Sequence, residues 1–85
     1  MDRRKRFPSL AHLDNNDIRL LLKRSTLSRI DRQIAVNALC WNMDDVDIGV
    51  AVGYDRSTIG RHLRCTIVPQ LEWLDAKTKL IKAEA

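Results

Sequence analysis

A helix-start signal recurs four times along this chain of 85 residues and limits the folds that the chain can adopt. Each copy begins with a residue whose side-chain oxygen can cap the first turn of a helix: Asp14, Ser28, Asp44 and Asp55. In three copies an acidic residue follows three positions later, and in three an apolar residue stands on each side, at the hydrophobic-staple positions. Only three Gly and two Pro punctuate the chain, which argues against a turn-rich β fold. The pattern predicts an all-α domain of about five short helices.

The apolar positions indicate which side of each predicted helix is buried. A first helix runs from the cap at Asp14 to about Arg24, with three consecutive leucines, 20–22, on its apolar side. The helix after Ser28 has a broad apolar arc, typical of a central helix; its members are Ile30, Ile34, Ala35, Ala38, Leu39 and Trp41. After a helix that begins at Asp44, Gly53 permits the positive φ that ends a helix.

The two remaining predicted helices meet at a proline. In the helix that follows Asp55, Ile59, Leu63 and Ile67 point to the core. We expect Pro69 to end or kink that helix, because proline lacks the backbone N–H of a helix interior, and a last helix to occupy 69–82.

Composition narrows the class of protein. No apolar run approaches the roughly 18 residues of a membrane span, and no apolar segment follows the charged N-terminus, so neither a membrane partner nor a secretory signal is expected. We expect a flexible basic arm over 1–9 and one cytoplasmic helical domain over 10–85. Cys40 and Cys65 lack paired metal-ligand spacing, so we expect no metal or cofactor; a zinc site with His12 and His62 is the alternative.

The segment from about 44 to 67 has the size and pattern of a helix-turn-helix, with Gly53-Tyr54-Asp55 as its turn. The predicted outward face of its second helix, 55–67, carries no acid. Its residues are Ser57, Arg61 and Arg64, flanked by Thr58 and Cys65 on one edge and by Gly60 on the other. Arginine forks match guanine acceptors or phosphates, and Gly60 lets a backbone approach closely. Arg56 and the first amides of this helix can add phosphate contacts, although a plain solvated basic face is the alternative.

This segment resembles the helix-turn-helix of bacterial and phage regulators, through the turn glycine Gly53, the apolar positions and the run RSTIGRHLR at 56–64. With the helix that starts near Leu27, the similarity extends to the four-helix unit of LuxR-type and sigma-factor region-four domains, over about 27–75. A looser similarity is to small lambdoid-phage transcription activators. Two features depart from these families. Gly49 stands where alanine is commonest, and acids crowd the start of the first motif helix, which often approaches a phosphate.

Other basic and apolar groups suggest further contacts. The run Arg3, Arg4, Lys5 and Arg6 resembles a minor-groove arm, with a solubilising tail as the alternative. A second basic group could follow the DNA backbone or bind an acidic partner such as RNA polymerase; it contains Arg19, Lys23, Arg24, Arg29 and Arg32. Single helix-turn-helix units usually bind as dimers. The candidate homodimer surface consists of Leu71, Trp73, Leu74 and Ile81, which could instead cover the core of the monomer.

The net charge of +4 suits a polyanionic partner, but its distribution carries more information, since acids gather at helix starts. The leading hypothesis is a sequence-specific regulator of transcription that binds double-stranded DNA with helix 55–67 in the major groove. The alternatives are an adaptor that binds RNA polymerase or another regulator, and an accessory protein of DNA recombination or packaging. An enzyme is not expected, because neither His12 nor His62 has an evident acid–base partner in the sequence.

Overall fold

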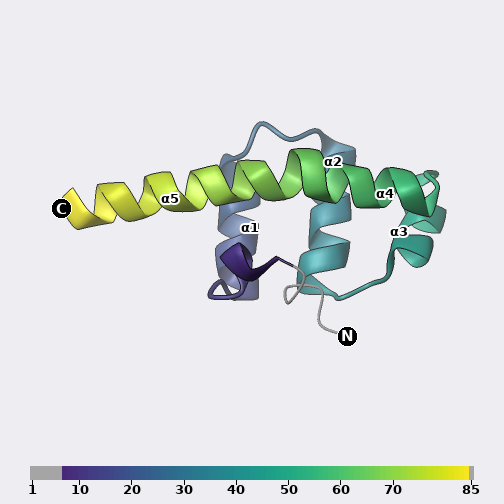
Figure 1. The fold of residues 1–85 in the computed structure, drawn as a ribbon, viewed down its shortest axis with the longest axis horizontal. Coiled ribbons are helices and arrows are strands. Elements are labelled where there is room, and N and C mark those ends of the chain that lie inside the picture. The colour runs from purple at the N-terminus through teal and green to yellow at the C-terminus, as the bar shows by residue number, and fades with distance from the viewer. Residues whose placement is uncertain (1–6, 85) are drawn as a thin grey trace.

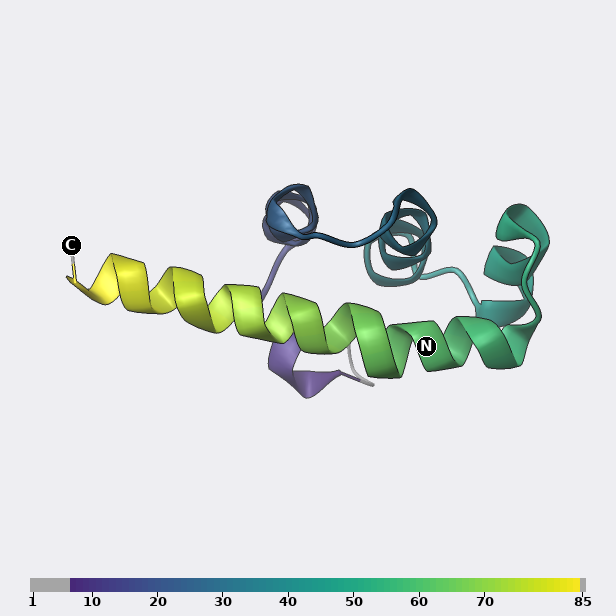
Figure 2. The ribbon, with the colours of Figure 1, turned by 90° about the horizontal axis from the view of Figure 1, so that it is seen from above.

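The computed structural model describes residues 7–84, and in this part of the chain all regular structure is helical (Figure 1). The predicted all-α class is therefore confirmed. The elements in chain order are η2 (Pro8–Leu10), α1 (Asn15–Arg24), α2 (Arg29–Ala35), η3 (Val36–Cys40), α3 (Asp45–Val52), α4 (Arg56–His62), η4 (Leu63–Ile67) and α5 (Val68–Glu84). Figure 2 shows α1 and α2 on one side of α5, with η2 on the other side and α3 beside α4 at one end.

The four predicted caps all form. The Asp14 carboxylate accepts a hydrogen bond from the Asp17 N–H at 2.8 Å, and the Asp17 side chain accepts one from the Asp14 N–H, which completes a capping box. Ser28, Asp44 and Asp55 accept bonds from the backbone N–H three residues later, at 3.1, 3.0 and 2.7 Å. Each cap satisfies an N–H that the helix itself cannot pair, so polar side chains fix where these helices begin.

Residues from every helix meet in one apolar core. Every helical element except η3 supplies one of the largest fully buried side chains, and η3 adds Ala38 and Leu39. The largest are Leu10, Ile18, Ile34, Ile48, Ile59, Leu63, Ile67 and Leu71. The predicted buried positions of the segment 55–67 are thus confirmed, because Ile59, Leu63 and Ile67 are all in this set. The core joins the two N-terminal helices to the C-terminal half in one unit.

The prediction that Pro69 ends the helix is wrong, because α4, η4 and α5 form one unbroken long helix, residues 56–84 (Figure 1). Immediately before Pro69, the segment Leu63–Ile67 is π-helical, and the Val68 N–H donates to the Leu63 carbonyl five residues back. A proline removes one helical N–H and its ring crowds the carbonyl four residues earlier. The wider π turn loosens the backbone at that place, so the helix passes through the proline without ending.

The buried face of the second predicted helix is rotated relative to expectation. Ile34, Ala35 and Ala38 are buried as predicted, but Ile30 and Trp41 are exposed. At the start of the helix, Asp31 is buried in place of its neighbour Ile30. At its end, η3 is π-helical, which changes the direction in which the following residue, Trp41, points.

Part of the predicted arm is folded. Phe7 is half-buried against the core, and the following turn η2 delivers the fully buried Leu10. Arg3, Arg4, Lys5 and Arg6 lie outside the described residues. Among the helices of the described chain, none is both long and apolar enough for a membrane crossing.

Candidate nucleic-acid interface

The helices α3 and α4 and the turn between them form a compact α3–α4 unit, residues 45–62, at one end of the molecule (Figure 1). Gly53 ends α3 in the left-handed conformation, with φ at 82°, as its position in the sequence predicted. The N–H groups of Gly53 and Tyr54 both donate to the Gly49 carbonyl, at 2.8 and 3.0 Å. These bonds reverse the chain within two residues before the cap of α4 at Asp55.

Gly49 is essential to this turn. A Cβ atom built on Gly49 would collide with the backbone carbonyl oxygen of Tyr54. Backbone atoms cannot move aside as a flexible side chain can, so the close contact between α3 and the turn requires glycine. Alanine is commonest at this position in the motifs that the segment resembles, but in this structure glycine is a condition of the turn.

The first part of the long helix presents a basic face to solvent. Because Ile59 and Leu63 are buried, the opposite side of α4 and η4 is outward, as the helical periodicity predicted. This outward side borders a shallow, open depression of about 420 Å³, which lies against the start of α3. The residues that line the depression are Asp45, Arg56, Ser57, Gly60, Arg61 and Arg64.

Two other predicted residues of this face, Thr58 and Gly60, are less exposed to solvent than expected. Thr58 is half-buried, and its backbone and side chain hydrogen-bond to Asp55. Gly60 is buried, and a Cβ at Gly60 would lie 3.6 Å from the Arg64 Nη1 atom and 3.6 Å from the Asp45 Oδ2 atom. Both side chains thus come close to Gly60, and the backbone that the sequence predicted to be open to a close approach is buried.

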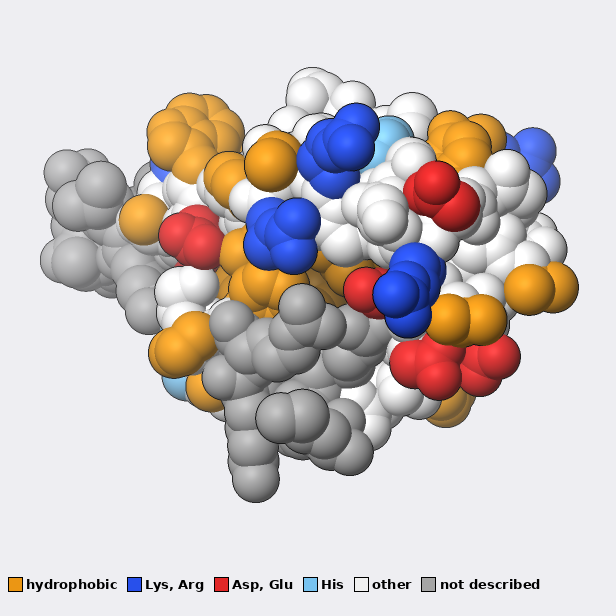
Figure 3. All heavy atoms as spheres, turned by 45° about the vertical axis from the view of Figure 1, so that its right-hand side comes forward, with side chains coloured by type: hydrophobic (Ala, Val, Ile, Leu, Met, Phe, Trp, Pro, Cys, Tyr) orange, Lys and Arg blue, Asp and Glu red, His pale blue; other side chains and the backbone are white. Residues whose placement is uncertain are grey.

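Acidic side chains also face this end of the molecule. In Figure 3, Lys and Arg side chains are interspersed with Asp and Glu side chains and with exposed hydrophobic ones, so no single basic surface forms there. The acids of α3 have separate roles: Asp44 caps the helix, Asp47 supplies the capped N–H, and Asp45 lines the depression. The predicted crowding of acids at the start of α3 is present.

Asp55 carries the one clear electrostatic perturbation among the described residues. Hydrogen bonds from the side chain and the backbone N–H of Thr58, together with the positive charge of Arg61, lower the pKa of Asp55 below its ordinary value of 3.8. The carboxylate that caps α4 is therefore ionised over the whole neutral range. Its charge lies next to the basic face without being buried.

Sequence reasoning missed an ion pair that ties α4 to α2. The His62 Nδ1 atom lies 2.7 Å from the Asp31 Oδ1 atom, and the His62 ring packs at 5.4 Å from the Tyr54 ring. Asp31 is buried although the sequence assigned it only to a helix start. No signal in the sequence links positions 31 and 62, since their proximity depends on how the helices pack. The pair fixes the α3–α4 unit against the N-terminal half.

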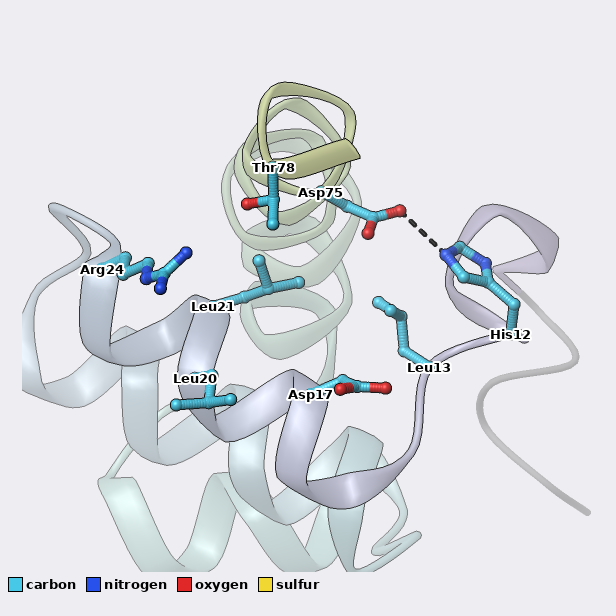
Figure 4. A pocket seen from close by; sticks show the side chains of 8 residues that line it. All are labelled: His12, Leu13, Asp17, Leu20, Leu21, Arg24, Asp75 and Thr78. Atoms are coloured by element: carbon cyan, nitrogen blue, oxygen red, sulfur yellow. Dashed lines mark hydrogen bonds and ion pairs between the residues drawn. The ribbon is translucent and has the colours of Figure 1, made fainter. Parts of the chain in front are cut away.

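A second histidine pair borders a groove between α1 and α5 (Figure 4). The His12 Nε2 atom lies 2.9 Å from the Asp75 Oδ2 atom, and the groove of about 300 Å³ beside it has a leucine floor. Figure 4 shows Arg24 and Thr78 at the other end of this groove. Both histidines thus have carboxylate partners, which corrects the expectation that neither has one.

The four predicted dimer residues have three different outcomes. Leu71 is fully buried and Leu74 is half-buried against the core, so these two stabilise the monomer and the assignment of Leu71 to an outer surface is wrong. Trp73 is 60% exposed, and the Lys77 Nζ atom lies 4.9 Å from its ring centroid. The Ile81 side chain lies outside the described residues.

Within the described part of the chain, no three His, Cys, Asp or Glu side chains converge to hold a metal ion. Cys65 is an exposed free thiol and Cys40 a half-buried one. Comparison with protein-family models, with curated proteins and with solved structures finds no significant match to this chain.

Proposed function

We propose that this protein binds double-stranded DNA through the α3–α4 unit and regulates transcription, with α4 and η4 in the major groove. The observation that carries the proposal is the exposed side of this helix, where Arg56, Arg61, Arg64 and Ser57 line one depression while Ile59 is buried. A helix that packs by one side and presents guanidinium groups and a hydroxyl on the other suits the width and chemistry of the major groove.

One of these arginines would contact a phosphate and the other two would contact bases. Arg56 is the first residue of α4, beside the backbone N–H groups that the helix leaves unpaired, and this position suits a phosphate. Arg61 and Arg64 lie five and eight residues further along the helix, where a guanidinium fork can reach guanine O6 and N7. Arg3, Arg4, Lys5 and Arg6 would add contacts to the phosphates or the minor groove.

A second copy of the chain completes the proposal. One recognition helix buries too little surface for a specific site, so helix-turn-helix proteins usually bind as dimers. With Leu71 in the core, the available aromatic residue on α5 is Trp73, which is exposed beside Lys77. We place the homodimer contact at Trp73 and expect Trp73→Ala to shift sedimentation toward the monomer, with the helical circular dichroism unchanged.

Selection of bound duplexes from a random DNA pool tests the proposed function. We expect a defined consensus, in two half-sites if the dimer binds, and an affinity that falls steeply with salt as phosphate contacts release counterions. A consensus-free pool with a steep salt slope would instead identify a packaging or architectural protein. Absence of binding to any duplex at low salt would contradict DNA binding altogether.

An adaptor that binds another protein is the second candidate, and one surface favours it. The exposed Trp41 follows η3, and its ring centroid lies 5.7 Å from the guanidinium carbon of Arg19 on α1. Leu20, also on α1, is exposed as well. Trp and Arg are enriched at the centres of protein interfaces. Copurification of RNA polymerase with the wild type and not with Trp41→Ala, together with no binding to duplex DNA, would favour the adaptor.

A further inference from the structure

Asp45 occupies an unusual place for an acid on a DNA-binding surface. Its Oδ2 atom and the Arg64 Nη1 atom both lie 3.6 Å from one point, the position of a Cβ on Gly60. An acceptor group and a donor group are therefore presented together, above the one residue of this face that has no side chain. Both groups line the depression that the proposed function assigns to DNA.

Capping does not explain this acid. The cap of α3 is Asp44, whose Oδ1 atom accepts the Asp47 N–H at 3.0 Å. Asp45 and Asp47 both lie in the first turn of α3, where a negative charge is favourable, so this effect does not distinguish Asp45 from Asp47. A carboxylate among arginines also weakens the attraction for phosphate, so Asp45 would lower the affinity for DNA of any sequence.

The edge of a G·C pair in the major groove has the complementary arrangement. Guanine presents the N7 and O6 acceptors, and beside them cytosine presents the N4 amino donor. A guanidinium can donate to guanine, while a neighbouring carboxylate can accept from cytosine N4. A thymine in the place of cytosine presents the O4 acceptor instead, which a carboxylate repels.

We propose that Asp45 is a specificity-determining residue that accepts a hydrogen bond from cytosine N4, while Arg64 donates to the guanine of the same base pair. This inference rests on the DNA-binding function proposed above. The charge of Asp45 lowers the affinity for every duplex, because it repels phosphates. Asp45 adds a favourable contact only at a G·C pair in one orientation, so it increases selectivity.

The test removes one amino group from the DNA and one carboxylate from the protein. In the selected duplex, each cytosine in turn is replaced by 2-pyrimidinone, which lacks the N4 amino group and still pairs with guanine. Affinities are measured for the wild type, Asp45→Ala and Asp45→Asn. Asp47→Asn is the matched control, since it removes the same charge from the same helical turn outside the depression.

At one cytosine, we expect 2-pyrimidinone to weaken wild-type binding by about tenfold and Asp45→Ala binding by less than about twofold. Asp45→Ala should also bind random duplex several-fold more tightly, whereas Asp47→Asn should keep the cytosine effect. Equal effects of 2-pyrimidinone on the wild type and Asp45→Ala at every cytosine would overturn the inference and leave the DNA-binding function standing. Failure of the wild type to enrich any duplex would overturn both.

Discussion

The α3–α4 unit contains one glycine that cannot be replaced without strain, Gly49 on α3, and one that can, Gly60 on α4. At Gly49 a methyl group would collide with the Tyr54 carbonyl, while at Gly60 it would make ordinary contacts at 3.6 Å. Gly49→Ala should therefore lower the free energy of unfolding by about 1–3 kcal/mol, through overpacking against backbone. Gly60→Ala should raise it by up to about 1 kcal/mol, because alanine favours a helix interior. Urea denaturation of both variants measures the difference.

The Gly60 variant separates stability from function. Its added methyl group would contact both Asp45 and Arg64, the two side chains that the proposal assigns to one base pair, so binding to the selected duplex should weaken while stability rises. Unchanged affinity in a more stable Gly60→Ala protein would show that DNA does not approach this part of α4.

The contact between His62 on α4 and the buried Asp31 on α2 should contribute to stability. His62→Ala leaves the Asp31 carboxylate, which is 8% exposed, without its histidine partner. Loss of a partner from a buried polar group costs about 1–3 kcal/mol. The control is His12→Ala, which breaks the pair with Asp75 at a more exposed histidine and should cost less than about 1 kcal/mol. Equal losses in thermal denaturation would mean that the burial of Asp31 is unimportant.

The cap of α4 should make stability depend on acid pH. The folded state lowers the pKa of Asp55, so the ionised cap stabilises the fold above the ordinary value of 3.8, and this contribution disappears as the pH falls through the lower folded value. Asn caps a helix without a charge. We expect wild-type protein to exceed Asp55→Asn in stability at neutral pH and the difference to vanish at the acid end. A difference that is constant with pH would contradict this account.

The residues at which the helices begin could be predicted from the sequence, but the continuation of the long helix past Pro69 could not. Caps at Asp14, Ser28, Asp44 and Asp55 are local, because each side chain bonds a backbone N–H three residues away. The passage of the long helix through Pro69 depends on the π-helical turn before it, which has no sequence signature of its own. Periodicity alone therefore divided one helix into two.

The link between the α1–α2 loop and the long helix offers a test at this scale. The Gln70 side-chain oxygen accepts the Thr26 N–H at 2.9 Å, and its amide nitrogen donates to the Thr26 hydroxyl at 3.3 Å. Gln70→Ala loses both bonds and should reduce the free energy of unfolding by about 1 kcal/mol. Gln70→Glu keeps the acceptor and should lose less. Indistinguishable chemical denaturation of all three proteins would mean that this link contributes nothing.

At the scale of the whole molecule, the sequence predicted which residues form the basic face, but not which residues of other helices lie next to it. Periodicity correctly opposed Arg61 to Ile59 and Leu63, because residues on one helix have a fixed angular relation. The position of Asp45 over Gly60 and the pairing of His62 with Asp31 depend on how separate helices pack. The net charge of +4 comes from residues 1–6, which contribute +3, and residues 79–84, which contribute +1, so the charges of residues 7–78 balance. On the face in Figure 3 acids and bases alternate, which favours selective rather than indiscriminate contacts.

The most direct test of the account compares the affinity of the wild type and Arg61→Ala for the selected duplex and for random duplex. Arg61 lines the depression and lies outside the core, so the variant should fold normally. We predict a loss of about 1–3 kcal/mol on the selected duplex, a much smaller loss on random duplex and a relaxed base preference at one position. Unchanged affinity for both duplexes would contradict the claim that this helix binds DNA.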